Sequence, residues 1–235
     1  MSFSLVGTQW NLAGFEKYLS KTDTGWSDSV TIHHTGFPDL AMRKKGLTAQ
    51  HIRNIRDYYK GKGWSGGPHL FIDDLDISGM NPLNERGVHA RSFNSKSIGI
   101  EVLGNYDNED PKSGRGWECW KLTAKVVAAI LNAKGLPATK ATILFHRDDP
   151  KTSKTCPGNK IEKVWFIALV KGEMEGKPDQ PDEPEDECDE HLKGIAWQVE
   201  QIKKEFQTMD DESLEKRLGF IEWRAKQLCL RTAVN

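Results

Sequence analysis

Apolar and polar residues follow two different periods along the first 172 residues, and each period predicts one kind of element. Apolar residues that recur every three to four positions predict helices over residues 9–20, 49–60, 117–134 and 160–171. Shorter β-branched and apolar runs predict strands over residues 28–35, 69–73, 97–104 and 142–146. Because helices and strands do not alternate strictly, we expect an α/β fold in which helices flank a central mixed β-sheet.

Each predicted helix has one apolar face, and two of the helices have a recognisable end. Thr48 is the expected N-cap of the second helix, and Gly135 is the expected stop of the third. Residues 79–87 are rich in turn formers and predict no regular element. The positions expected to face the core are Leu12, Phe15 and Leu19, then Ile52, Ile55 and Tyr59, then Trp120, Ala124, Val127 and Leu131, and finally Ile161, Val164, Trp165 and Ala168.

The pattern changes beyond residue 172. Residues 173–190 contain ten acidic residues and three prolines at every third position, which is typical of an extended, self-repelling linker. Residues 192–206 and 214–228 each repeat an apolar residue at alternating spacings of three and four, and two such short seams predict a helical hairpin over 191–235. In that hairpin Cys188 and Cys229 lie opposite each other, so a disulfide is geometrically possible but not required.

Charge divides the chain at the same place. The formal net charge is −1, yet residues 173–235 carry 9 Lys and Arg against 17 Asp and Glu, so residues 1–172 carry 24 against 17. A basic body favours an anionic polymer as partner, although attraction between body and tail or simple solubilisation explains the acidic tail as well. The four cysteines form no spaced disulfide framework, and no stretch resembles a signal peptide or a membrane span.

Residues 143–158 carry the clearest chemical pattern. A short apolar run ends at His146, and a polar loop of nine residues then leads to Cys156. Neutral imidazole and thiolate both suit Zn²⁺, so one segment supplies two ligands of one metal.

A third metal ligand is expected from the strand at 28–35, which contains the pair His33 and His34. Neighbouring side chains of a strand point to opposite faces, so only one of the two can bind the metal, and strand geometry leaves open which one does. We expect both histidine ligands on strands of one sheet and Cys156 on a loop over its edge. Three protein ligands leave one tetrahedral position for water, which is the arrangement of catalytic zinc sites.

Glu101 lies in the middle of the most apolar predicted strand, residues 97–104. An ionised carboxylate there is costly unless it is paired or hydrogen-bonded, so Glu101 is a candidate functional residue. The alternative is a glutamate at an exposed position of the strand.

An ordered set of short motifs resembles the type-2 N-acetylmuramoyl-L-alanine amidases, a family that includes phage lysins, muropeptide-recycling enzymes and peptidoglycan recognition proteins. The resemblance covers about residues 25–170 and implies a central mixed sheet flanked by helices. It also implies cleavage of the amide between the lactyl group of N-acetylmuramic acid and L-alanine. The motifs are Ile32-His33-His34-Thr35, Gly63-Trp64, His69-Leu70-Phe71-Ile72, Gly87-Val88-His89-Ala90, Asn94, Ser97-Ile98-Gly99-Ile100-Glu101, Gly104-Asn105-Tyr106, His146-Arg147 and Cys156-Pro157-Gly158.

The resemblance assigns roles to single residues. His33, His146 and Cys156 align with the family's zinc ligands, which implies one Zn²⁺ per chain and selects His33 over His34. Glu101 and Lys154 align with catalytic residues, the carboxylate as proton carrier and the ammonium as a stabiliser of the oxyanion. The residues expected to bind substrate or to orient the ligands are His34, His69, His89 and Asn94, although loop hydrogen bonding explains His89 and Asn94 equally well.

One position departs from the family. Many members have a tyrosine just before the position of His69, and its hydroxyl helps at the metal, whereas this chain has Pro68. Because the zinc ligands are all retained, we expect activity to be retained too, with His69 or Glu101 taking part of the tyrosine's role.

These observations favour a zinc amidase of the phage or prophage endolysin type. The alternatives are a cytosolic amidase that recycles soluble muropeptides and a peptidoglycan-binding protein without activity. We expect peptidoglycan as the partner, no nucleic acid, no insertion into a membrane, and either homo-oligomerisation or wall docking through residues 191–235. Synthesis is expected in the host cytoplasm without a signal peptide, with action on the cell wall after release.

Overall fold

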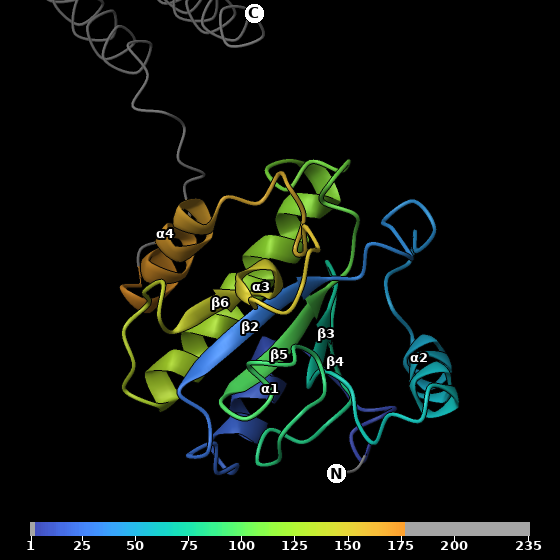
Figure 1. Ribbon diagram of the computed structural model, residues 1–235. Coiled ribbons are helices and arrows are strands. Elements are labelled where there is room, and N and C mark those ends of the chain that lie inside the picture. The colour runs from blue at the N-terminus through green and yellow to red at the C-terminus, as the bar shows by residue number, and fades with distance from the viewer. Residues whose placement is uncertain (1–2, 177–235) are drawn as a thin grey trace, which may run out of the picture. The chain divides into compact units, whose positions relative to one another are not determined.

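A mixed sheet with helices packed against it makes up the fold in the computed structural model, which describes residues 3–176 (Figure 1). The strands are β1 (Gln9–Trp10), β2 (Ser29–His34), β3 (Leu70–Ile72), β4 (Ile77–Gly79), β5 (Ser97–Val102) and β6 (Ile143–Phe145). The helices are α1 (Leu12–Leu19), α2 (Ala49–Gly61), α3 (Gly114–Ala133) and α4 (Lys163–Met174), with a short 3-10 helix, η1 (His146–Asp148), directly after β6. The predicted fold class is confirmed for this part of the chain.

The sheet has the strand order β1-β4-β3-β5-β2-β6. Strands β3, β5, β2 and β6 run parallel to one another, while β4 and β1 add an antiparallel edge. In the pairing of β2 with β5, His33 lies opposite Glu101. The register of two central strands therefore brings together a predicted ligand and a predicted catalytic residue that are 68 positions apart in the sequence.

Side chains alternate between the two faces of the sheet and separate structural from chemical residues. On the helix-covered face, Val30 and Ile32 of β2 and Ile98 and Ile100 of β5 join one buried cluster with residues of α1, α3 and α4 (Figure 1). The alternate positions, which include His33 and Glu101, lie on the opposite face, called the open face below. This alternation places His33 rather than His34 on the face opposite this cluster.

The ends of several elements differ from the sequence-based prediction. The helix predicted over 9–20 begins only at Leu12, because Gln9 and Trp10 pair with β4 as an edge strand and Asn11 caps the helix. Strand β4 was not predicted, since three residues are too few to show a period. Helix α3 begins at Gly114, three residues early, and Thr48 caps α2 as predicted, accepting a hydrogen bond from the His51 backbone N–H at 3.3 Å.

The last helix is out of phase with its prediction. It begins at Lys163 rather than 160, so Val164 is 64% exposed and Ala168 is exposed, and both predicted core positions are wrong. Phe166, Leu169 and Val170 face the core instead. The helix ends at Met174, two residues past the predicted boundary at 172. Predictions for the rest of the linker, the hairpin over 191–235 and the pair Cys188–Cys229 lie outside the described residues.

Within residues 3–176, no helix has both the length and the apolar character needed to cross a membrane. Cys119 and Cys156 are both buried and both free thiols. The predicted zinc ligand therefore carries no disulfide.

Trp120 is the largest fully buried side chain among the described residues, and its replacement tests the core. Its ring packs edge-on against Tyr106 at 5.2 Å, Phe166 at 5.1 Å and Trp165 at 6.0 Å. We expect Trp120→Ala to lower the free energy of unfolding by about 3–5 kcal/mol. We expect Trp120→Phe to cost far less, because within residues 3–176 the buried Nε1 has no hydrogen-bond partner to lose. Urea unfolding of both variants measures the difference, and equal losses would contradict this account.

Candidate active site

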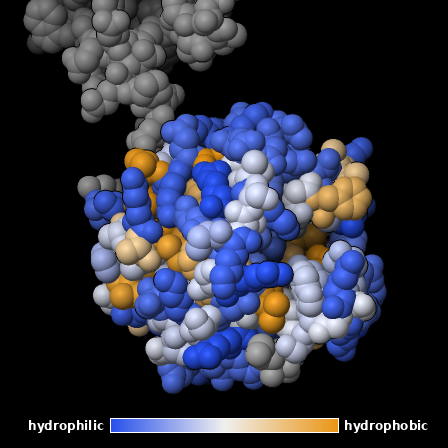
Figure 2. All heavy atoms as spheres, in the orientation of Figure 1, coloured by the Kyte–Doolittle hydropathy of each residue, from blue (hydrophilic) through white to orange (hydrophobic). Residues whose placement is uncertain are grey.

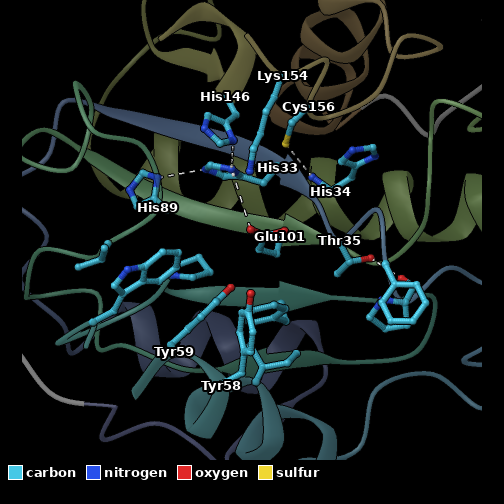
Figure 3. Close-up of a pocket in the computed structure, with 17 residues that line it drawn as sticks. His33, His34, Thr35, Tyr58, Tyr59, His89, Glu101, His146, Lys154 and Cys156 are labelled. Carbon is cyan, nitrogen blue, oxygen red and sulfur yellow. Dashed lines mark hydrogen bonds and ion pairs between the residues drawn. The ribbon is translucent and has the colours of Figure 1, made fainter. Parts of the chain in front are cut away.

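A cavity of about 420 Å³ lies on the open face of the sheet, between the sheet and α2. His33 and Glu101 come from the sheet, Tyr58 and Tyr59 from α2, and Lys154 from the loop after η1 (Figure 3). The surface on this side is mostly hydrophilic and is hollowed between the sheet and α2 (Figure 2). The remaining lining residues are His34, Thr35, Phe37, Pro38, Ile55, Trp64, Pro68, Phe71, Val88, His89, His146 and Cys156.

The three predicted metal ligands meet at one wall of this cavity. His33 is near the end of β2, His146 is the first residue of η1, and Cys156 follows on the loop, with all three ligand atoms within 4.8 Å of one another. His146 thus lies just after its strand and not on it, which corrects one detail of the prediction. Parallel pairing of β2 with β6 brings these distant segments together.

The donor set fits Zn²⁺. The Nδ1 atoms of His33 and His146 are 3.1 Å apart, close to the separation of about 3.3 Å expected for two nitrogens bound tetrahedrally to one zinc ion. Burial lowers the pKa of both imidazoles, and in His33 the neighbouring His89 and His146 lower it further. Both rings are therefore neutral at pH 7, which is the form that binds a metal.

The local structure holds the sulfur in place. The backbone N–H of Arg147 donates to the carbonyl of Cys156 at 2.8 Å, and the Arg147 guanidinium donates to the Gly158 carbonyl at 2.8 Å and also to that of Ile161. Gly158 has φ +115°, and a Cβ there would come within 2.4 Å of the Tyr106 backbone, so only glycine suits this turn. The loop is therefore fixed to η1 and to the segment after β5.

The surroundings of Cys156 act on its charge in two directions. Burial and the nearby Glu101 raise the pKa of the thiol, whereas the His34 backbone N–H, at 3.4 Å from Sγ, and the cations of Lys154 and Arg147 lower it. A divalent ion at the three ligands favours the thiolate outright.

Glu101 faces the ligands from the adjacent strand. Its Oε1 is 4.0 Å from His33 Nδ1, and the side chain is 15% exposed. Burial raises the pKa of Glu101 to about 8, and the Lys154 ammonium partly opposes that rise. Figure 3 shows Lys154 reaching toward His33 from the loop that carries Cys156. A carboxyl group and a cation thus share the cavity with the three candidate ligands.

The raised pKa of Glu101 has a consequence for stability in the metal-free protein. In the unfolded chain the carboxyl titrates near 4.5, and in the folded chain near 8, so its stabilising contribution is complete below pH 4.5 and is lost as pH rises to about 8. We expect Glu101→Gln to remove that loss and to stabilise the metal-free protein at pH 8.5, relative to pH 4.5, by on the order of 3–5 kcal/mol. Urea unfolding with a chelator at both pH values measures the change, and an equal effect at both would refute it.

The other predicted residues have different positions. His34 lines the cavity and its Nδ1 accepts from the Tyr106 backbone N–H at 3.1 Å, so its ring is tied to the segment after β5. His69 is fully buried and does not line the cavity. Its Nδ1 accepts from the Gly99 N–H and its Nε2 donates to the Glu85 carbonyl, both at 2.9 Å. The expectation that His69 takes the role of the missing tyrosine is therefore wrong, since neither nitrogen is available.

His89 and Asn94 belong to the loop before β5. His89 lines the cavity, and its Nδ1 is 3.1 Å from His33 Nε2. Asn94 Oδ1 accepts from the backbone N–H groups of His89 and Ala90, both at 2.8 Å. Loop hydrogen bonding, one of the two alternatives, accounts for the Asn94 carboxamide oxygen, and Asn94 also lines the second cavity described below.

Aromatic residues on the far wall were not identified from the sequence. Tyr59 packs against a buried cluster, as predicted, but it also lines the cavity together with Tyr58, and in Figure 3 both hydroxyls point toward Glu101. Trp64 and Phe37 add exposed rings, 45% and 77% exposed, to the same cavity. The expectation for this helix named only the positions on one face, and Tyr58, which is 60% exposed, lies outside that face.

A second cavity of about 460 Å³ adjoins the first and shares Trp64, Val88, His89, His146 and Lys154 with it. Its other lining residues include Arg91 and Lys151. His146 therefore borders both cavities, and the second one adds the cations of Arg91 and Lys151.

Comparisons with known proteins show the family to which the chain is similar. A family profile described as N-acetylmuramoyl-L-alanine amidase matches residues 24–159, a segment that contains all three ligands. Peptidoglycan-recognition protein SC2 of Drosophila simulans is 28% identical over 152 residues, which cover 63% of this chain and 78% of that protein. Peptidoglycan-recognition protein 2 of Holotrichia diomphalia is 31% identical over 94 residues, covering 36% and 46%. Among solved structures, the endolysine N-acetylmuramoyl-L-alanine amidase LysCS from Clostridium intestinale URNW is similar at 25% identity and a TM-score of 0.48, covering 62% of this chain and 84% of that one.

Proposed function

The chain belongs to the N-acetylmuramoyl-L-alanine amidase family, and from that premise we propose that it hydrolyses the amide between N-acetylmuramic acid and L-alanine with one Zn²⁺. The observation that carries the proposal is the convergence of His33, His146 and Cys156 within 4.8 Å at the wall of a cavity that also holds Glu101 and Lys154. A binding protein needs no such combination of ligands, proton carrier and cation.

Each residue has a chemical task in this reaction. Zn²⁺ held by His33, His146 and Cys156 would supply Lewis acidity for the substrate carbonyl and would lower the pKa of the attacking water. Glu101 accepts the proton of the attacking water and donates it to the amine of L-alanine as the C–N bond breaks. Lys154 stabilises the negative charge that develops on the carbonyl oxygen. The products are the muramic acid carboxylate and the free amino group of the peptide.

Position 68 has no tyrosine hydroxyl in this chain, but the hydroxyl groups of Tyr58 and Tyr59 face Glu101. A phenol in that place can donate a hydrogen bond to the substrate or to Glu101. The tyrosines of α2 therefore take the role of the family's tyrosine hydroxyl in this chain, and Glu101 shares that role as the proton carrier.

The substrate we propose is the intact cell wall, with the protein acting as a phage or prophage endolysin after release from the host cytoplasm. The excess of basic residues over 1–172 supports approach to an anionic polymer. The acidic linker and the second module predicted over 191–235 support a role at a surface, where docking or oligomerisation raises the effective concentration.

Three measurements on one preparation test the proposal. Purified sacculi should lose turbidity in the presence of the protein, the products should carry new L-alanine amino groups, and one zinc ion per chain should be found by elemental analysis. Cleavage of soluble muropeptides without loss of turbidity would favour a recycling enzyme. Binding to sacculi without any new amino groups would refute the hydrolase.

A further inference from the structure

Four imidazoles lie in a row on the open face, and their contacts determine where the protons are. His89 Nε2 is 3.1 Å from the Ser97 carbonyl. His89 Nδ1 is 3.1 Å from His33 Nε2, and His33 Nδ1 is 3.1 Å from His146 Nδ1 (Figure 3). His69 packs beside His89 with ring centroids 6.0 Å apart. Only the rings of His89, His33 and His146 take part in the chain of hydrogen bonds, because both nitrogens of His69 bind backbone groups.

The proton positions follow from the Ser97 carbonyl, which can only accept. His89 Nε2 therefore carries the one ring hydrogen of the neutral imidazole, and His89 Nδ1 has a free lone pair. That lone pair accepts a hydrogen bond from His33 Nε2–H. A neutral imidazole carries only one ring hydrogen, so His33 Nδ1, the nitrogen that faces His146 and Cys156, has none.

We propose that His89 is a positioning residue that holds His33 in the tautomer with Nδ1 free to bind the metal, by relaying the polarity of the Ser97 carbonyl through its own ring. This inference rests on the zinc site of the proposed function. Groups that orient a ligating histidine in this way generally contribute a factor of about 10–100 to metal affinity.

The residues around His89 hold its ring in position for this contact. The ring lies against Gly99 of β5, where an added Cβ would meet His89 Cγ and Cδ2 at 2.5 Å. Asn94 Oδ1 holds the His89 and Ala90 backbone N–H groups at 2.8 Å, which fixes the loop that carries the ring. The His89 and His33 rings are nearly perpendicular, at 89° with centroids 5.2 Å apart, so the contact is a hydrogen bond in the plane of one ring and not a stack.

Zinc affinity, measured by competition with a chromophoric chelator, separates hydrogen bonding from packing. We expect His89→Phe, which keeps a ring of similar size but no acceptor, to weaken zinc binding by about 10–100-fold. We expect His89→Asn, whose Oδ1 can stand near the position of Nδ1, to recover most of that loss. The matched control is His69→Phe. It also removes a buried imidazole and two hydrogen bonds to the backbone, but it removes no hydrogen bond to a zinc ligand. It should leave zinc affinity close to that of the wild type.

Long-range ¹H–¹⁵N spectra of histidine-labelled protein give a readout that does not depend on activity. We expect His89 and His33 both to carry the hydrogen on Nε2, with and without zinc, and His33 to become a mixture of tautomers in metal-free His89→Phe. Unchanged zinc affinity in His89→Phe, or a hydrogen on Nδ1 of His89, would overturn the inference. Failure of the wild type to bind zinc would instead refute the proposed metal site, and the tautomers of the metal-free protein would still decide the role of His89.

Discussion

Replacement of Cys156 by alanine is expected to abolish both zinc binding and amide hydrolysis. Cys156 is one of the three proposed ligands, it is 6% exposed, and Arg147 holds its loop in place. Within residues 3–176 no other His, Cys, Asp or Glu completes a ligand cluster with His33 and His146. Two imidazoles alone hold zinc far more weakly than a set that includes a thiolate. Zinc content after gel filtration and the release of amino groups from sacculi measure the two losses.

Cys119→Ala is the matched control for this experiment. Cys119 is also a buried free thiol, but it lies on α3 within the helix-covered core and does not line the cavity. We expect this variant to keep its zinc and its turnover and to lose only a modest amount of stability. Full zinc content and full activity in Cys156→Ala would remove the metal from the mechanism.

Most of what positions the ligands was accessible from the sequence. Two apolar runs, residues 28–35 and 97–104, predicted strands, and their alternation is what puts His33 and Glu101 on the face opposite the helix-covered core cluster. The residues left the choice between His33 and His34 open, because a strand's pattern does not say which face a cavity occupies. Parallel pairing with β6 and burial of Ile32 decide it in the structure.

The rest depended on contacts that no local pattern encodes. Strands β1 and β4 have two and three residues, so their pairing is visible only in the folded sheet. The role of His89 depends on a loop folding over Gly99, and the cavity position of Tyr58 and Tyr59 depends on where α2 packs. Helix α4 was out of phase because Ile161 is buried in the segment before the helix and resembles its first core position.

Replacement of Glu101 by glutamine is expected to leave zinc bound and to lower turnover by about 10²-fold or more. Glutamine keeps the shape of the side chain but cannot accept the proton of the attacking water. Glu101 is not one of the three clustered ligands, so metal content should not change. In the wild type, turnover should fall as pH decreases through the pKa of Glu101, because only the carboxylate is a base, and a bound cation lowers that pKa from the metal-free value of about 8.

The same pH dependence distinguishes a proton carrier from a residue that merely shapes the cavity. If Glu101 transfers the proton, the residual rate of Glu101→Gln should lose the wild-type decline on the acid side above pH 6, where the histidine ligands keep their metal. Glu118→Gln, on an exposed position of α3, is the control and should follow the wild-type profile. A tenfold slower variant with an unchanged pH profile would assign Glu101 to substrate positioning, and an unchanged rate would exclude Glu101 from the reaction. Loss of both the rate and the decline on the acid side, with zinc retained, leaves proton transfer by the Glu101 carboxylate as the step that limits hydrolysis.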